Sequence, residues 1–204
     1  AVGLFLALGD SYLSWLTVTE LHQSTLEMLA HGYGRGGHAG YSLFVLWMPI
    51  NGFQITTIYF FLIWPALAAM PYGWSYGQER NSGVTQQITT RSGKRTYFNA
   101  KFISVFISGG FAVFLPILMN LLVDAMICPY ALPKLGIVPV FNGNFLSALY
   151  YTNPWVYAIC WCMMEFLFGG AAACLCFVVG SMLKFRVMTI LVPLVLLTVF
   201  DRLS

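Results

Sequence analysis

The chain has 204 residues, of which 59% are hydrophobic and only 8% are charged. Soluble domains carry about 25% charged residues, so the composition excludes an ordinary water-soluble globular protein and indicates a membrane protein. The net charge of +3 does not indicate nucleic-acid binding, because the cations gather in a few polar connections and do not cover one face.

Apolar stretches of about 20 residues predict membrane-spanning helices. Five are present, so we expect an all-α membrane protein, a polytopic helical bundle that forms one transmembrane domain over residues 1–204. The predicted spans are residues 1–19, 43–70, 102–127, 154–183 and 187–200. Asp10 interrupts the first span, and Pro49 and Pro65 predict kinks in the second. Asn153 and Pro154 predict the N-cap and first position of the fourth helix.

The charges of the connections predict an orientation. Seven cations fall in the second and fourth connections between the spans, residues 79–101 and 181–186: Arg80, Arg91, Lys94, Arg95, Lys101, Lys184 and Arg186. Arg35, Lys134 and Arg202 remain for the other side. Because cytoplasmic loops are enriched in Lys and Arg, we place the N-terminus and segment 79–101 on the cytoplasmic side of the plasma membrane. The membrane is expected to be bacterial. A sixth span is expected beyond the five.

Several motif fragments lack the context that their chemistry needs. Segment 32–37 matches the dinucleotide-binding glycine pattern without a preceding strand, and Gly93-Lys94-Arg95 lacks the Ser or Thr that follows a P-loop lysine. The three histidines fall in an expected outer loop, 22–40, without metal-site spacing. The five cysteines lie in or beside apolar runs, which favours simple packing. We expect no catalytic residue, metal site or cofactor in this chain.

Glu165 is the one acidic residue deep in a strong predicted span, about 17 Å along the helix from Pro154 at 1.5 Å per residue. Ionised groups in lipid cost several kcal/mol. Glu165 therefore either faces a translocation pathway or a partner, or is protonated and hydrogen-bonded to a neighbouring helix, and both alternatives stay open. The small residues 169–173 that follow predict a close contact between helices.

The polar segment 79–101 has an ordered pattern. Glu79-Arg80-Asn81-Ser82-Gly83 comes first, Thr90-Arg91-Ser92-Gly93-Lys94-Arg95-Thr96-Tyr97 follows, and Lys101 enters a helix. With the preceding Pro71-Tyr72-Gly73 and the order of the spans, the pattern resembles the ABC-2-type transporter permeases from about Leu43 onward.

The resemblance implies a six-helix subunit that pairs as a homodimer or with a related permease. Each half would dock a separate ATP-binding cassette subunit, which holds the ATP and Mg. The segment between the second and third spans would couple the two subunits, and the residues implied are Glu79, Arg80, Gly83, Arg91, Lys94, Arg95 and Lys101. Their cations could meet an acidic partner surface or the headgroups of membrane lipids.

The leading hypothesis is thus a permease subunit of an ATP-driven exporter, without an ATPase site of its own, for a peptide, drug or lipid-like amphiphile. The alternative is an ATP-independent membrane channel or a receptor-like helical protein. An intramembrane enzyme forms a third class, and no Ser/His/Asp or paired-carboxylate arrangement is visible in the predicted spans to support it.

Overall fold

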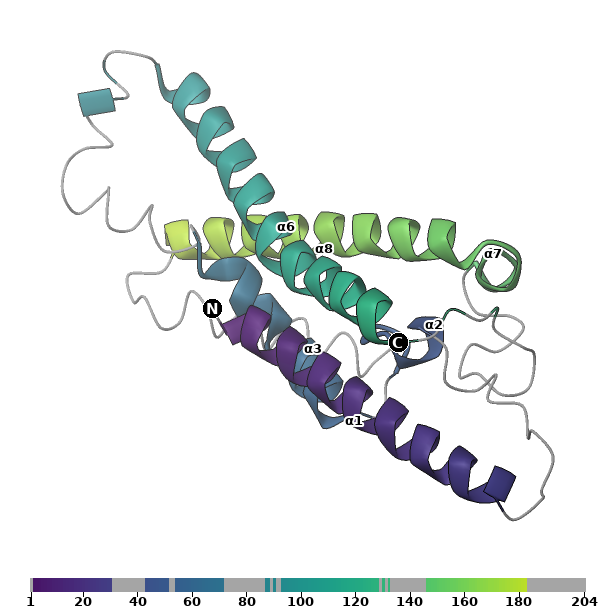
Figure 1. Ribbon diagram of the computed structural model, residues 1–204. Coiled ribbons are helices and arrows are strands. Elements are labelled where there is room, and N and C mark those ends of the chain that lie inside the picture. Colours follow the sequence, from purple (N-terminus) through teal and green to yellow (C-terminus); the bar gives the residue numbers. More distant parts are fainter. Residues whose placement is uncertain are drawn as a thin grey trace, which may run out of the picture. The chain divides into compact units, whose positions relative to one another are not determined.

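The computed structural model describes residues 2–30, 43–51, 54–71, 87–88, 90, 93–128, 130, 132 and 146–182. These residues form an all-helical fold, as the sequence predicts. The helices are α1 (Val2–Ala30), α2 (Leu43–Leu46), α3 (Ile55–Ala69), α6 (Lys94–Ile127), α7 (Ser147–Thr152) and α8 (Pro154–Met182) (Figure 1). The predicted fifth span, 187–200, lies outside the described residues, as do most of the connections.

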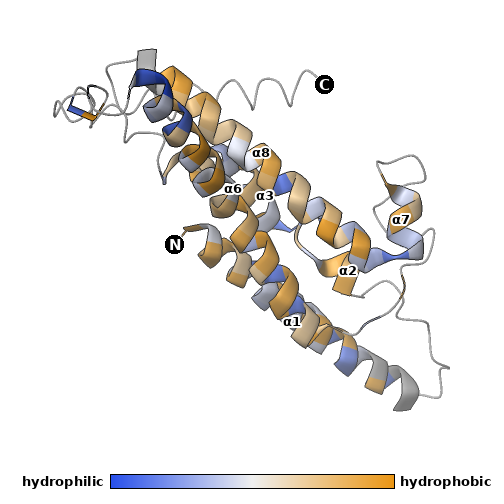
Figure 2. Cartoon of the chain, turned by 90° about the horizontal axis from the view of Figure 1, so that it is seen from above, coloured by the Kyte–Doolittle hydropathy of each residue, from blue (hydrophilic) through white to orange (hydrophobic). Residues whose placement is uncertain are grey.

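Three of these helices are long and apolar enough to cross a membrane: α1 over Val2–Ser24, α6 along its whole length and α8 over Pro154–Val179. The apolar helix α3 has 15 residues, or about 22 Å, which is less than the roughly 30 Å of a bilayer core. Figure 2 shows hydrophobic residues along α8 and the middle of α6, and hydrophilic residues where α6 begins.

Two helices continue beyond the predicted spans because helix formation does not require an apolar sequence. The first predicted span ends at residue 19, whereas α1 continues to Ala30. His22 therefore lies exposed on a helix and not in a loop, which corrects the prediction; His31 and His38 lie outside the described residues. Likewise, α6 begins at Lys94, ahead of the predicted start at 102. Gly93 precedes it with a φ of 79°, a conformation that favours glycine.

The structure divides the predicted span 43–70. α2 ends at Leu46, and the chain turns over residues 47–51, where the amides of Ile50 and Asn51 both donate to the Trp47 carbonyl at 2.9 and 3.0 Å. The cause lies in the sequence: Pro49 disfavours a helical conformation at the residue before it, and an Asn-Gly pair follows at 51–52. Pro65 remains inside α3. α8 begins at Pro154, and the Tyr157 amide donates to the Asn153 carbonyl at 3.1 Å, as the sequence predicts for this helix start.

The chain forms two compact units. Unit 1 comprises residues 1–59 and 116–162, and unit 2 comprises residues 60–115 and 163–204. Helices α3, α6 and α8 each contribute residues to both units. In unit 1, α1 and the last part of α6 run in the same direction (Figure 1).

Unit 2 is built on a close contact between α6 and α8. A Cβ atom at Gly109 would lie 2.2 Å from the Cβ of Ala173, and one at Gly169 would lie 3.1 Å from the Gly109 carbonyl oxygen. These separations confirm the close helix contact that the small residues of α8 predict, since only glycine allows two helices to approach so closely. Phenylalanines fill the adjacent positions: the Phe106 ring lies over Gly170 and the Phe166 ring over Gly110.

The contacts also set the relative direction of these helices. Val105, Ala173, Cys174 and Phe177 form one buried cluster, whereas Gly110 contacts Phe166. Advancing along α6 therefore means going back along α8, so the two are antiparallel.

All five cysteines of the chain are thiols outside any disulfide, and four are buried. This agrees with the packing role predicted for them.

We expect the substitution Gly109→Ala to destabilise the protein. The added methyl group would overlap Ala173 and lie 3.0 Å from the Ala68 carbonyl oxygen. Such overpacking costs about 1–3 kcal/mol, which outweighs the gain of up to about 1 kcal/mol that alanine has over glycine in a helix. Thermal unfolding of the purified protein in detergent measures the effect as a lower melting temperature.

Gly9→Ala is the matched control. A Cβ atom at Gly9 would meet only the Cγ2 of Thr56, at 3.8 Å, which is an ordinary contact. This variant should melt at or above the wild-type temperature. If both variants melt like the wild type, the close approach of α6 and α8 is wrong.

Candidate functional site

The predicted coupling residues are placed only in part. Glu79, Arg80, Gly83 and Arg91 lie outside the described residues. Lys94 and Arg95 are the first two residues of α6 and are exposed, whereas Lys101 is half-buried two turns later. Because seven residues make about two helical turns, Lys94 and Lys101 share one face of α6. The helix thus presents two of the predicted cations on one side, with Arg95 beside them.

Glu165 lies half-buried on α8, in unit 2. No hydrogen bond or ion pair joins it to another of the described residues, so the helix-to-helix hydrogen bond considered from the sequence is not found among them. Its neighbour Phe166 instead makes the aromatic contacts of this region, with ring centroids 5.3 Å from Phe111 and 6.0 Å from Phe106. The role of Glu165 in a translocation pathway stays a prediction.

A second set of polar residues gathers inside unit 1. Its members are fully or almost fully buried, with at most 3% of each side chain exposed. We call them the Asn120 cluster: Asp10, Ser11 and Ser14 of α1, Thr57 of α3, and Asn120 and Asp124 of α6. Buried polar groups in apolar surroundings are costly unless they are hydrogen-bonded, so such a concentration calls for a physical explanation.

Asn120 uses both ends of its amide to join three segments. Its Nδ2 donates to the Ser11 Oγ at 2.9 Å and to the Asp10 Oδ2 and the Ala7 carbonyl at 3.3 Å each. Its Oδ1 accepts from the backbone amide of Met48 at 3.1 Å. The side chain therefore links α6 to α1 and to the turn between α2 and α3. That turn carries free backbone groups, and Asn120 supplies the acceptor that one of them needs.

Asp10 receives hydrogen bonds from three side chains. The hydroxyls of Thr56 and Thr57 donate to its Oδ1 at 2.5 and 3.2 Å, and Asn120 donates to its Oδ2. All three side chains can donate, so both oxygens of the carboxyl group have hydrogen-bond partners inside the protein. Thr57 also lies 3.4 Å from the Met48 carbonyl oxygen. Asp10, which in the sequence merely interrupts an apolar run, thus fixes the beginning of α3.

Asp124 and Ser14 differ from the rest of the cluster. Neither carboxylate oxygen of Asp124 has a hydrogen-bond partner among the described residues, nor does the hydroxyl of Ser14. The Ser11 hydroxyl is a neighbour of Asp124, although it does not reach hydrogen-bond geometry. Cys128 follows one turn later. Burial and then the negative charge of Asp124 raise the pKa of its thiol to about 12, so Cys128 remains neutral.

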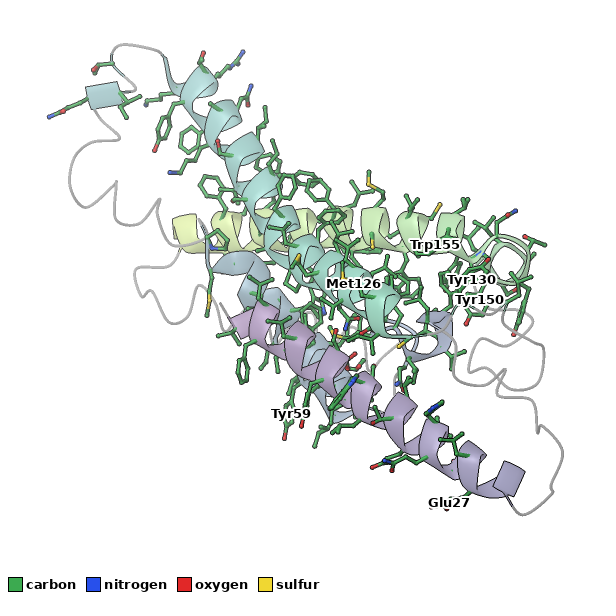
Figure 3. All side chains as sticks on the ribbon, in the orientation of Figure 1. Glu27, Tyr59, Met126, Tyr130, Tyr150 and Trp155 are labelled. Carbon is green, nitrogen blue, oxygen red and sulfur yellow. The ribbon has the colours of Figure 1, made fainter. Side chains whose placement is uncertain are left out.

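Several aromatic side chains pack together near α7 in the same unit. The buried Tyr150 hydroxyl donates to the Phe44 carbonyl at 3.0 Å, and burial raises the pKa of this phenol, which keeps it a donor. The Phe44 ring meets Tyr130 and Trp155 edge-on at centroid distances of 5.9 and 5.2 Å. Figure 3 shows Tyr130, Tyr150 and Trp155 together beside α7 and the start of α8. These contacts hold α2 in place.

Sequence reasoning missed the Asn120 cluster. It treated Asp10 as an interruption of the first span and did not single out Asn120 or Asp124. A signal was present, because Asn120 and Asp124 lie four residues apart in an apolar run and hence on one helix face. The sequence could not show the hydrogen-bond partners of Asp10 and Asn120, which lie 46 to 113 positions away along the chain.

Comparison with protein families, curated proteins and solved structures finds no match to this chain.

We expect Asn120→Ala to destabilise the protein by about 1–3 kcal/mol, because it leaves the Met48 amide without its buried acceptor and removes the hydrogen bond to the Asp10 Oδ2. The free energy of unfolding in detergent, followed by loss of helicity, measures this. Asn99→Ala, at an exposed position of the same helix, is the control and should stay within about 0.5 kcal/mol of the wild type. Equal effects for both variants would contradict a linking role for Asn120.

Proposed function

We propose that this chain is the permease subunit of an ATP-driven ABC exporter of the ABC-2 type. Two such subunits, identical or related, would form the pathway for a peptide, drug or lipid-like amphiphile in the plasma membrane. A separate ATP-binding cassette subunit would hold ATP and Mg, so that the chain itself is not an enzyme. The N-terminus and segment 79–101 would face the cytoplasm.

The observation that carries this proposal is the ordered motif that leads into α6. Glu79-Arg80-x-x-Gly83 and a basic run precede Lys94 and Arg95, which open a helix that continues for 34 residues to Ile127. A helix of this length spans about 51 Å, enough to start in the aqueous phase and cross a bilayer. A partner that grips segment 79–101 would therefore act directly on a membrane-crossing element.

Helix electrostatics favour a negatively charged partner at this position. The beginning of a helix carries a partial positive charge, and cations there are unfavourable by about 0.3–1 kcal/mol each. The first turn of α6 has two cations and no acidic residue. Stability of the isolated helix does not explain such an arrangement. An acidic surface on the ATP-binding subunit, or anionic lipid headgroups, would offset the repulsion.

The outward-facing side chains suit the proposed surroundings. Large hydrophobic residues are exposed along the three long helices, among them Phe5 of α1, Ile103 of α6 and Leu167 of α8, with 77%, 58% and 54% of each side chain accessible. Water would make such surfaces unfavourable, whereas lipid or a second permease subunit would cover them. Glu165, half-buried within α8, is the residue that we propose for the translocation pathway.

Reversing the charges of Lys94 and Arg95 tests the proposal. The double variant Lys94→Glu/Arg95→Glu should weaken association with the ATP-binding subunit by about 10- to 100-fold, because changing charged residues at the centre of an interface lowers the affinity by about this factor. The measurement is co-purification of a Walker-motif ATPase with the tagged chain from its native membrane, together with ATP hydrolysis by the complex. Arg35→Glu, a cation assigned to the opposite side, should leave both unchanged.

Two results would contradict the proposal. One is that no Walker-motif subunit accompanies the wild-type chain under several mild detergent conditions, which would favour an ATP-independent channel or a receptor-like protein. The other is undiminished ATP-driven transport in the double variant, which would remove the coupling role from the start of α6.

A further inference from the structure

The Asn120 cluster contains buried polar groups that no other described residue satisfies. Asp124 and Ser14 are both 0% exposed, and their side-chain oxygens have no hydrogen-bond partner among the described residues. An ionised carboxylate in apolar surroundings costs several kcal/mol unless it is paired. No Lys, Arg or His among the described residues forms an ion pair with Asp124 or Asp10. Within the described part of the chain, no positive charge therefore compensates these carboxylates.

Helical register brings the unsatisfied groups together. Ser14 lies one turn beyond Asp10 and Ser11 on α1, and Asp124 lies one turn beyond Asn120 on α6. Asn120 is hydrogen-bonded to both Asp10 and Ser11. Because α1 and this part of α6 run in the same direction (Figure 1), the next turns also face each other. Ser14 and Asp124 are thus at the same level of unit 1.

The hydroxyl of Ser14 differs from three other hydroxyls of its helix. Thr17, Thr19 and Ser24 each donate to a backbone carbonyl three or four residues earlier, at 2.8–3.0 Å. This is the common arrangement for Ser and Thr within helices. Ser14 makes no such bond, which leaves its oxygen available to a ligand.

The charge balance indicates what that ligand is. Asp10 already has three donors, from Thr56, Thr57 and Asn120, whereas the Ser11 hydroxyl beside Asp124 does not reach hydrogen-bond geometry. Asp124 is thus the less compensated of the two carboxylates, and one monovalent cation is sufficient to neutralise it. Hard cations take oxygen ligands, and divalent ones use several carboxylates or ordered waters. No group of three or more His, Cys, Asp or Glu suited to a metal occurs among the described residues, which favours a monovalent ion.

The interrupted helix beside the cluster fits an ion site. The turn at residues 47–51 contacts it through the Met48 amide, bound to Asn120, and the Met48 carbonyl, bound to Thr57. Broken helices at membrane depth occur where the backbone is buried in protein or lines a site, and in transporters their free carbonyls coordinate ions. Here such a break contacts Asn120 and Thr57, which both donate to the Asp10 carboxylate.

We propose that the Asn120 cluster binds one alkali-metal ion, Na⁺ or K⁺, with Asp124 as its charged ligand and Ser14 as a neutral one. The ion neutralises Asp124 and satisfies oxygens from α1 and α6 at once. It thereby holds these two helices together in unit 1. This site does not depend on the exporter function, since it is defined by buried groups remote from segment 79–101 in the sequence.

Thermal unfolding of the purified full-length chain tests the site. The melting temperature is measured in NaCl, in KCl and in choline chloride at equal ionic strength. Binding to the folded state should raise it by about 3–6 °C at ten times the dissociation constant, with saturation. Asp124→Asn should abolish the alkali-ion effect, and Glu20→Gln, an exposed carboxylate of α1, should retain it.

A second variant and a direct measurement keep the test decisive if Asp124→Asn does not fold. Ser14→Ala should raise the half-saturating ion concentration at least threefold, and radioactive sodium should bind the wild-type chain at one site. Identical melting in alkali and choline salts, or an alkali-ion effect that survives Asp124→Asn, would overturn the proposal. So would a pH-dependent melting temperature without any alkali-ion effect, because the occupant would then be a proton.

Discussion

Polar groups buried within an apolar bundle must find their partners inside the protein, and in unit 1 this requirement falls on Asn120. Its amide joins α6 to α1 through Asp10 and Ser11, and it joins both to the turn before α3 through the Met48 amide. Each of these groups would be costly alone. Because one side chain satisfies all of them, the three segments have a single favourable arrangement, and the interruption at residues 47–51 becomes part of the fold.

Unit 2 depends on the opposite kind of contact. Gly109 and Gly169 bring α6 and α8 together with no side chain between them, and Phe106 and Phe166 cover the neighbouring glycines. Without a hydrophobic driving force in lipid, such close packing is a main source of helix association. α6 thus forms the hydrogen bonds of Asn120 in its last part and the close contact with α8 in its middle. Lys94 and Arg95 in its first turn are exposed.

The sequence predicts the parts of the fold that depend on composition. Hydropathy predicted an all-helical membrane protein, Pro154 marked the start of α8, and the small residues of α8 predicted its close contact. It predicted less well where polar residues continue a helix, as at Lys94–Lys101 and after Thr19, since hydropathy and helicity are different properties. The candidate coupling residues came from an ordered motif. The Asn120 cluster could not be predicted, because its energy depends on pairings between residues far apart in the chain.

The hydrogen bond between Asp10 and Asn120 couples α1 to α6. A double-mutant cycle with Asp10→Ala, Asn120→Ala and the combined variant measures this coupling directly, through the free energies of unfolding in detergent. We expect a coupling energy of about 0.6 kcal/mol, the average for hydrogen bonds between membrane helices, and at most about 1.7 kcal/mol. Additive effects, within about 0.3 kcal/mol, would contradict it.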